Sequence, residues 1–161
     1  MPFGIGYHPA FAVPFDDKHT LSDYELRFEK MESPLCINNL PHGLMHGNFY
    51  YLGSNIIALP ITKELFANDS HCMTNLSSGT LGIYEKDTGR AVVCDIRDFP
   101  YTLLWSKPGF DPRFVCIEPL GGHGSRNVAT TRAAGSYQTT DRKSTRLNSS
   151  HPSSSRMPSS A

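Results

Sequence analysis

Three short stretches of this 161-residue chain carry side chains that can do chemistry. In the first, residues 6–11 read GYHPAF, so His8 lies between aromatic residues with a proline directly after it. The proline restricts the backbone around the imidazole. Histidine ionises near neutral pH and is the most frequent general acid or base in enzymes. The alternative is a histidine at a strand end that satisfies backbone groups.

The second stretch reads FVCIEP and alternates as a β-strand does. Phe114, Cys116 and Glu118 fall on one face, and Val115 and Ile117 fall on the other. A carboxylate that ends an apolar strand loses hydration, which raises its pKa and makes it a stronger base. The alternative is a glutamate that points into water.

The third stretch, FANDS, contains Asp69, and we consider it together with Trp105. Aspartate accepts hydrogen bonds from hydroxyl groups, and an aromatic ring offers an apolar platform for the CH face of a sugar. Residues 63–67, which overlap this stretch, suggest a helical turn with Thr62 as its N-cap. The alternative is a polar loop and a core tryptophan.

Other motifs are weaker. His42 and His46 have the spacing of a helical metal pair, but the proline and glycines around them disfavour a helix and no third ligand is evident. Residues 121–124, GGHG, are not followed by a helix as a phosphate loop requires. No G-x-S-x-G nucleophile motif is present. We therefore expect no metal and no cofactor.

The elements that must position these side chains read as strands. They cover residues 24–29, 49–52, 56–59, 81–84, 91–96, 101–105 and 114–118. The segments 49–52 and 56–59 look like one strand pair, and 81–84 and 91–96 look like a hairpin with Gly89 in its turn. Short strands separated by turn residues predict an all-β fold, an antiparallel sandwich or barrel.

Composition excludes several classes of protein. Lys plus Arg and Asp plus Glu are 15 each, which argues against a nucleic-acid partner held by charge. No apolar run approaches the length of about 18 residues that a membrane span needs, so no membrane partner is expected. The N-terminus has no secretory signal pattern, and the four cysteines have no C-x-x-C spacing. We expect reduced thiols and a cytoplasmic location.

The balanced charge hides a division along the chain. Residues 1–123 hold 9 basic and 14 acidic side chains, and residues 124–161 hold 6 basic and 1 acidic. Residues 141–161 are rich in serine, without apolar periodicity, and are predicted to be disordered. They also resemble translated sequencing or assembly read-through, the interpretation we favour. The alternative is a basic arm for an acidic partner.

Several segments together resemble the aldose 1-epimerase (galactose mutarotase) family, closest to its bacterial galactose mutarotase-like branch. The resemblance covers residues 1–140 and rests on four motifs in the family's order: PFGIGYHPAF; LPIT with LFANDS; DFPYTLLWSKPG with FVCIEPLGG; and RAAGSY. It implies an antiparallel β-sandwich with a sugar cleft on one sheet, and no cofactor.

The resemblance also implies a reaction, the interconversion of the α and β anomers of an aldohexose by ring opening. Glu118 would take the proton from the C1 hydroxyl, and His8 would protonate the ring oxygen. Asp69 would bind a sugar hydroxyl and Trp105 would line the cleft. Leu120 stands where the family usually has tryptophan, which would loosen the cleft.

The family has a second active-site histidine and an arginine ahead of the matching segment. We therefore expect residues 1–140 to be the C-terminal part of such a domain, with its N-terminal half absent, and weakly active or inactive. One alternative is a non-catalytic carbohydrate-binding domain on the same fold. Another is a protein-interaction β-domain with a basic tail.

Overall fold

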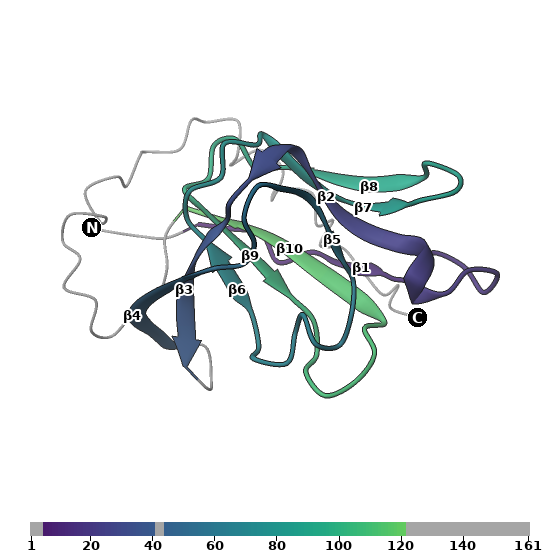
Figure 1. The fold of residues 1–161 in the computed structure, drawn as a ribbon, viewed down its shortest axis with the longest axis horizontal. Coiled ribbons are helices and arrows are strands. Elements are labelled where there is room, and N and C mark those ends of the chain that lie inside the picture. The colour runs from purple at the N-terminus through teal and green to yellow at the C-terminus, as the bar shows by residue number, and fades with distance from the viewer. Residues whose placement is uncertain (1–4, 41–43, 122–161) are drawn as a thin grey trace, which may run out of the picture.

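The computed structural model describes residues 5–40 and 44–121, which form two antiparallel β-sheets packed face to face (Figure 1). The described residues contain one short 3₁₀ helix, η1 (Leu21–Asp23), and no α-helix. The prediction of an all-β antiparallel sandwich is confirmed. The predicted boundary at residue 140 and the serine-rich segment 141–161 lie outside the described residues, as do His42 and the side chain of His46.

The larger sheet has six strands and the smaller has four (Figure 1). The order in the larger sheet is β1 (Ala10–Ala12), β10 (Phe114–Leu120), β9 (Tyr101–Trp105), β6 (His71–Met73), β3 (Leu35–Leu40) and β4 (Leu44–Tyr51). The order in the smaller sheet is β5 (Ile56–Pro60), β2 (Tyr24–Glu32), β7 (Thr80–Glu85) and β8 (Ala91–Asp95). No helix among the described residues is long and apolar enough to cross a membrane.

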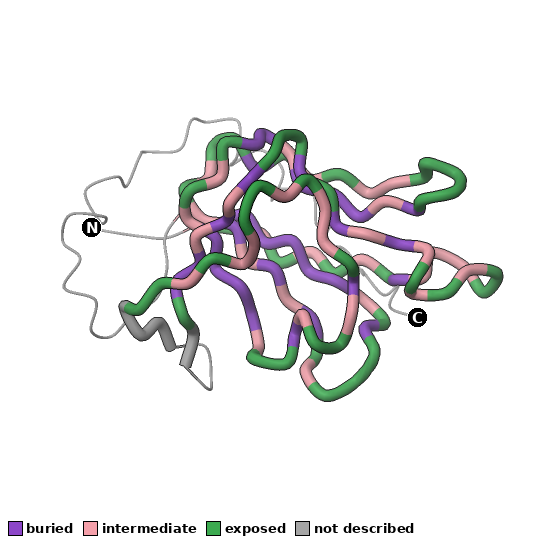
Figure 2. The backbone as a smooth tube through the Cα atoms, in the orientation of Figure 1, coloured by how far each residue is buried: buried purple, intermediate pink, exposed green. Residues whose placement is uncertain are grey.

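The hydrophobic core lies between the two sheets (Figure 2). Leu104, Val115 and Ile117 enter it from the larger sheet, and Leu26 and Ile83 enter it from the smaller one, all with no exposed surface. Each such side chain stabilises the fold by about 1.5–3 kcal/mol through burial. Because side chains alternate along a strand, this packing turns the opposite face of β10 away from the core.

The strand predictions are confirmed for the hairpin of β7 and β8, in which Gly89 has a φ of +70°. The predicted pairing of residues 49–52 with 56–59 is wrong, because β4 and β5 belong to different sheets. The chain crosses between the sheets here beside the link from β2 to β3. Leu52 N–H donates to the carbonyl of Pro34 at 2.9 Å, and Asn55 N–H donates to Ser33 Oγ at 2.9 Å.

Two further boundaries differ from the sequence-based expectation. Strand β10 continues through Pro119 to Leu120, beyond the predicted end at residue 118. Residues 63–68 form successive turns rather than a helix, although Thr62 Oγ1 does accept a hydrogen bond from Leu65 N–H at 3.2 Å. Strands β1, β3 and β6 were not predicted.

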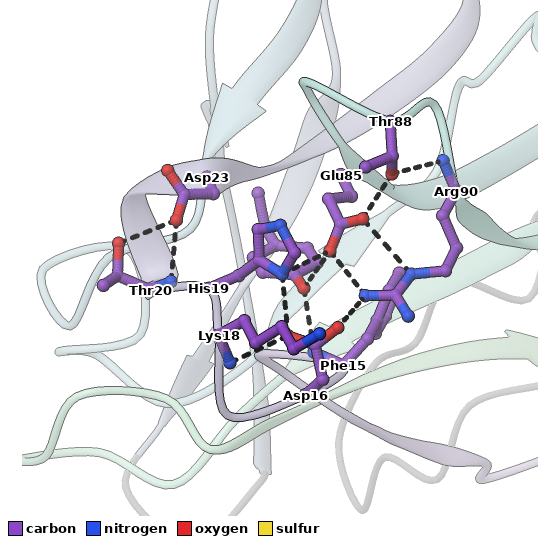
Figure 3. Close-up of polar contacts among 10 residues, drawn as sticks. Phe15, Asp16, Lys18, His19, Thr20, Asp23, Glu85, Thr88 and Arg90 are labelled. Carbon is purple, nitrogen blue, oxygen red and sulfur yellow. Dashed lines mark hydrogen bonds and ion pairs between the residues drawn. The ribbon is translucent and has the colours of Figure 1, made fainter.

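A buried carboxylate, Glu85, joins the segment after β1 to the smaller sheet (Figure 3). It accepts hydrogen bonds from Tyr24 Oη, from Thr88 Oγ1 and from Arg90, whose Nη2 lies 2.7 Å away. Arg90 also contacts Asp16 Oδ2 at 2.6 Å. The hydrogen bonds from Arg90, Thr88 and Tyr24 outweigh burial and lower the pKa of Glu85 to about 2.

The neighbouring His19 completes this cluster. Its Nδ1 lies 2.7 Å from Asp16 Oδ1 and 3.4 Å from Glu85 Oε1. The hydrogen bond to Asp16 raises the pKa of His19, and bonds from His19 and Arg90 lower the pKa of Asp16. The cluster therefore holds residues 15–19 against β2 and the β7–β8 hairpin, directly after the strand that follows His8.

This cluster predicts acid sensitivity. The pKa of Glu85 is lower in the folded chain, so its stabilisation is present above its usual pKa near 4.5 and is lost as pH falls from about 4.5 to about 2. We expect Glu85→Gln to lower the melting temperature at pH 7 and to flatten this part of the acid-induced loss of stability. Thermal unfolding by circular dichroism from pH 7 to pH 3 measures both effects.

The matched control is Glu64→Gln, because the Glu64 side chain is 71% exposed and its nearest cation, Lys63, is 3.9 Å away. It should unfold like the wild type at every pH. A Glu85→Gln variant with wild-type stability at pH 7 and an unchanged acid profile would contradict the role assigned to the cluster.

Candidate functional site

The antiparallel register of the N-terminal segment on β10 places His8 opposite Glu118. Ala10 pairs with Cys116 and Gly6 pairs with Leu120, so the position between them pairs residue 8 with residue 118. Tyr7 N–H donates to the Pro119 carbonyl at 3.1 Å. Residues 8 and 118 therefore form a non-hydrogen-bonded pair, the type in which opposite side chains approach most closely. His8 Nδ1 lies 3.4 Å from Glu118 Oε1.

The two side chains of this pair differ in their exposure to solvent. The Glu118 side chain is 9% exposed and the His8 side chain is 63% exposed. Among the described residues, only His8 makes an ion pair with the Glu118 carboxylate, and the Cys116 thiol lies beside both groups. Burial raises the pKa of Glu118, and the nearby His8 opposes part of that rise. A buried carboxylate without hydrogen-bond donors costs stability, so its position calls for a function.

Trp105 lies beside this pair on the same face of the sheet. It pairs with Cys116 in the register of β9 and β10, and its ring centroid lies 6.0 Å from that of His8, edge to face. Its indole N–H donates to Asp69 Oδ1 at 2.7 Å. The structure therefore brings the four residues predicted from sequence into one chain of contacts.

The loop that carries Asp69 is anchored on its core side. Phe66 is fully buried, and Asp69 adopts a φ of +73°, a left-handed conformation that aspartate tolerates better than most residues. His71 Nε2 contacts the Leu65 carbonyl at 2.5 Å, and Tyr50 Oη contacts His71 Nδ1 at 2.6 Å. A carbonyl only accepts, so Nε2 carries a proton, and in the neutral ring that burial favours Nδ1 accepts from the tyrosine hydroxyl.

His71 is consequently a neutral, structural histidine. Burial lowers its pKa, which agrees with the hydrogen-bond pattern. Its two bonds connect β4, β6 and the loop before β6, and thereby fix the loop on which Asp69 lies. Nothing in the sequence distinguished this histidine, because the strand HCM is too short to show a period.

Cys116 is the other group at the site that sequence reasoning left without a role. Its sulfur lies within 4.8 Å of the ligand atoms of both His8 and Glu118. Like the other three cysteines it is a free thiol, and burial raises its pKa to about 11. It is therefore a protonated thiol near neutral pH.

Two cavities in the described region lie away from the His8–Glu118 pair. One, of about 230 Å³, is lined by residues from the segments 73–79 and 96–102. The other, of about 290 Å³, is lined by residues 106–114 and includes Phe114, whose ring is 5.5 Å from that of Trp105. Neither cavity is lined by His8 or Glu118.

Comparisons with known proteins give the same fold. No family model matches the sequence. Two curated relatives, the plasmid and chromosomal LacX proteins of Lactococcus lactis subsp. lactis, are 31% identical over 125 residues, which is 76% of this chain and 41% of theirs. The chain thus spans about two fifths of the relatives that it matches.

Solved structures agree with these relatives. A galactose mutarotase related enzyme from Lactobacillus acidophilus has a TM-score of 0.67 and 23% identity, over 79% of this chain and 42% of that one. A galactose mutarotase-like protein from Lactobacillus casei has a TM-score of 0.63 and 28% identity, over 76% of this chain and 42% of that one. The sequence match and the shared sandwich agree, and the described residues have the fold of galactose mutarotase-like proteins.

Proposed function

We propose that this chain carries the acid/base pair of an aldose 1-epimerase, which interconverts the α and β anomers of an aldohexose. The observation that carries the proposal is the buried Glu118 carboxylate, which faces an exposed imidazole at 3.4 Å. That distance is longer than an ordinary hydrogen bond, so both groups remain available to a third molecule. The fold shared with galactose mutarotase-related proteins supports the same assignment.

The proposed reaction moves two protons. Glu118 takes the proton of the C1 hydroxyl while protonated His8 gives a proton to the ring oxygen, and the bond between C1 and that oxygen breaks. The product is the open-chain aldehyde, with Glu118 protonated and His8 neutral. After rotation about the C1–C2 bond, closure returns both protons and yields the other anomer.

The geometry suits this pair of transfers. The C1 hydroxyl and the ring oxygen are both bonded to C1, so the acid and the base that serve them must be close neighbours. Glu118 and His8 meet that requirement from adjacent chain segments. The raised pKa of Glu118 makes it a stronger base than an exposed carboxylate while leaving a group that ionises.

Asp69 and Trp105 are proposed to hold the sugar. The hydrogen bond from the indole N–H engages Asp69 Oδ1, which leaves Oδ2 to accept from a sugar hydroxyl. The Trp105 ring offers its apolar surface beside His8.

A second candidate is a non-catalytic carbohydrate-binding domain. The contact between the Trp105 indole and Asp69 offers a sugar-binding surface that needs no proton transfer, and it supports this alternative. Under this alternative Asp69 and Trp105 keep their roles, and Glu118 only accepts hydrogen bonds.

The variant Glu118→Gln separates the two candidates. The amide still accepts a hydrogen bond but takes no proton, so we expect the anomerisation rate to fall by about 10²–10⁴-fold with sugar affinity retained. Polarimetry on freshly dissolved α-glucose and α-galactose at high protein concentration measures the rate, and calorimetry measures the affinity. Glu64→Gln, a surface glutamate, is the control and should behave as wild type.

A wild-type chain that binds sugar but does not accelerate anomerisation would establish the binding domain instead. A Glu118→Gln variant that keeps the full wild-type rate would show that another group is the base.

The variant Asp69→Ala tests the sugar contact. It removes a charged acceptor, worth about 1.5–3 kcal/mol, so we expect the dissociation constant for the sugar to rise about ten- to a hundredfold. The effect should fall mainly on KM, because Asp69 is assigned to binding rather than proton transfer. Calorimetric titration checks this, with the exposed Asp87→Ala as control; equal affinities in the two variants would remove Asp69 from the site.

A further inference from the structure

We propose that His8, Cys116 and Glu118 form a binding site for Zn²⁺. Their ligand atoms, an imidazole nitrogen, a thiol sulfur and a carboxylate oxygen, all lie within 4.8 Å of one another. These are the three donor types that zinc takes in proteins. No metal was expected from the sequence, in which the three donors come from opposite ends of the described chain and show no spacing motif.

Strand pairing makes the set compact. Cys116 and Glu118 are two residues apart on β10 and therefore share one face, and His8 lies across from Glu118 on the neighbouring segment. Zinc bonds of about 2.0–2.3 Å in tetrahedral geometry place neighbouring ligand atoms about 3.3–3.7 Å apart. The separation of 3.4 Å between His8 Nδ1 and Glu118 Oε1 already meets that value.

The His8 side chain is free to move and makes the remaining adjustment of the ligand positions. The His8 side chain is 63% exposed and lies outside the regular strand, so its ring can turn toward Cys116 and open the path for the ion. Cys116 and Glu118 are buried in the sheet and supply the fixed part of the site. Three protein ligands leave a fourth position for water.

The donors also determine which metals bind. A thiolate and an imidazole favour Zn²⁺ and Co²⁺ over Mg²⁺ and Ca²⁺, which prefer oxygen ligands. Binding converts the Cys116 thiol to a thiolate and releases its proton to solvent. No oxidation or reduction takes place.

Asp16, His19 and Glu85 form a second group of potential metal ligands, which differs from the proposed site in two ways. Arg90 donates to both carboxylates of that group, so a positively charged side chain already occupies the place of a metal ion. The group also contains no sulfur ligand. Near Cys116 and Glu118, by contrast, no lysine or arginine makes an ion pair with Glu118 among the described residues.

The zinc site does not depend on the proposed catalytic function. A bound ion would occupy both His8 and Glu118, and would therefore inhibit any anomerisation that the chain performs. Metal binding is measured without a sugar, so its failure and the failure of the proposed function are separate results.

The test is a titration of the reduced, tag-free 161-residue chain with Co²⁺. Cobalt bound to Cys116 should produce a thiolate-to-metal charge-transfer absorption. It should also quench the fluorescence of Trp105, the single tryptophan, whose ring is 6.0 Å from that of His8. Zn²⁺ should then displace Co²⁺ at one equivalent, and excess Mg²⁺ or Ca²⁺ should not.

Two variants locate the site. Cys116→Ser should abolish the charge-transfer absorption, and His8→Gln should weaken Co²⁺ binding at least tenfold. Cys94→Ser and His19→Gln are the matched controls, a cysteine and a histidine outside the proposed site, and should bind as the wild type does.

Absence of the charge-transfer band in the wild type would overturn the proposal. So would a band that persists in Cys116→Ser, or a His8→Gln variant with unchanged affinity. If Cys116→Ser does not fold, His8→Gln decides the question alone, because an exposed histidine is replaced without loss of core packing.

Discussion

Strand β10 lies between β1 and β9, and the antiparallel register on its two sides determines where every side chain of the candidate site lies. On one side, the pairing of Ala10 with Cys116 brings His8 to Glu118. On the other side, the pairing of Trp105 with Cys116 brings the indole ring to the same face. A slip of one residue on either side would turn these groups into the core.

The two faces of β10 have different roles. Val115 and Ile117 are fully buried in the core and contribute to stability, while Cys116 and Glu118 lie on the other face and are candidates for chemistry. The carboxylate gains no donor from the described chain to offset its burial. The packing on the opposite face of β10 offsets the free energy that burying Glu118 costs, as is common for strained or desolvated functional groups.

Much of this arrangement could be predicted from the sequence, for physical reasons. The period of two along FVCIEP predicted the two faces of β10, because alternation is a local property of an extended chain. Which strands are neighbours is not local. The error over residues 49–52 and 56–59 arose because a short turn between apolar runs can lead to another sheet as readily as to a hairpin. His71 and Cys116 acquired their significance only through partners distant in sequence, Tyr50 for the first and His8 for the second.

The base and the acid of the proposed reaction lie on segments that differ in how firmly they are held in the sheet. Glu118 is on a central strand with partners on both sides, whereas His8 precedes a three-residue strand that is the last of the larger sheet among the described residues. Edge segments of this kind detach in local openings that cost far less free energy than global unfolding. The backbone amides of residues 7, 8 and 10–12 should therefore exchange with deuterium sooner than those of β10, and the two halves of the site can separate while the core remains folded.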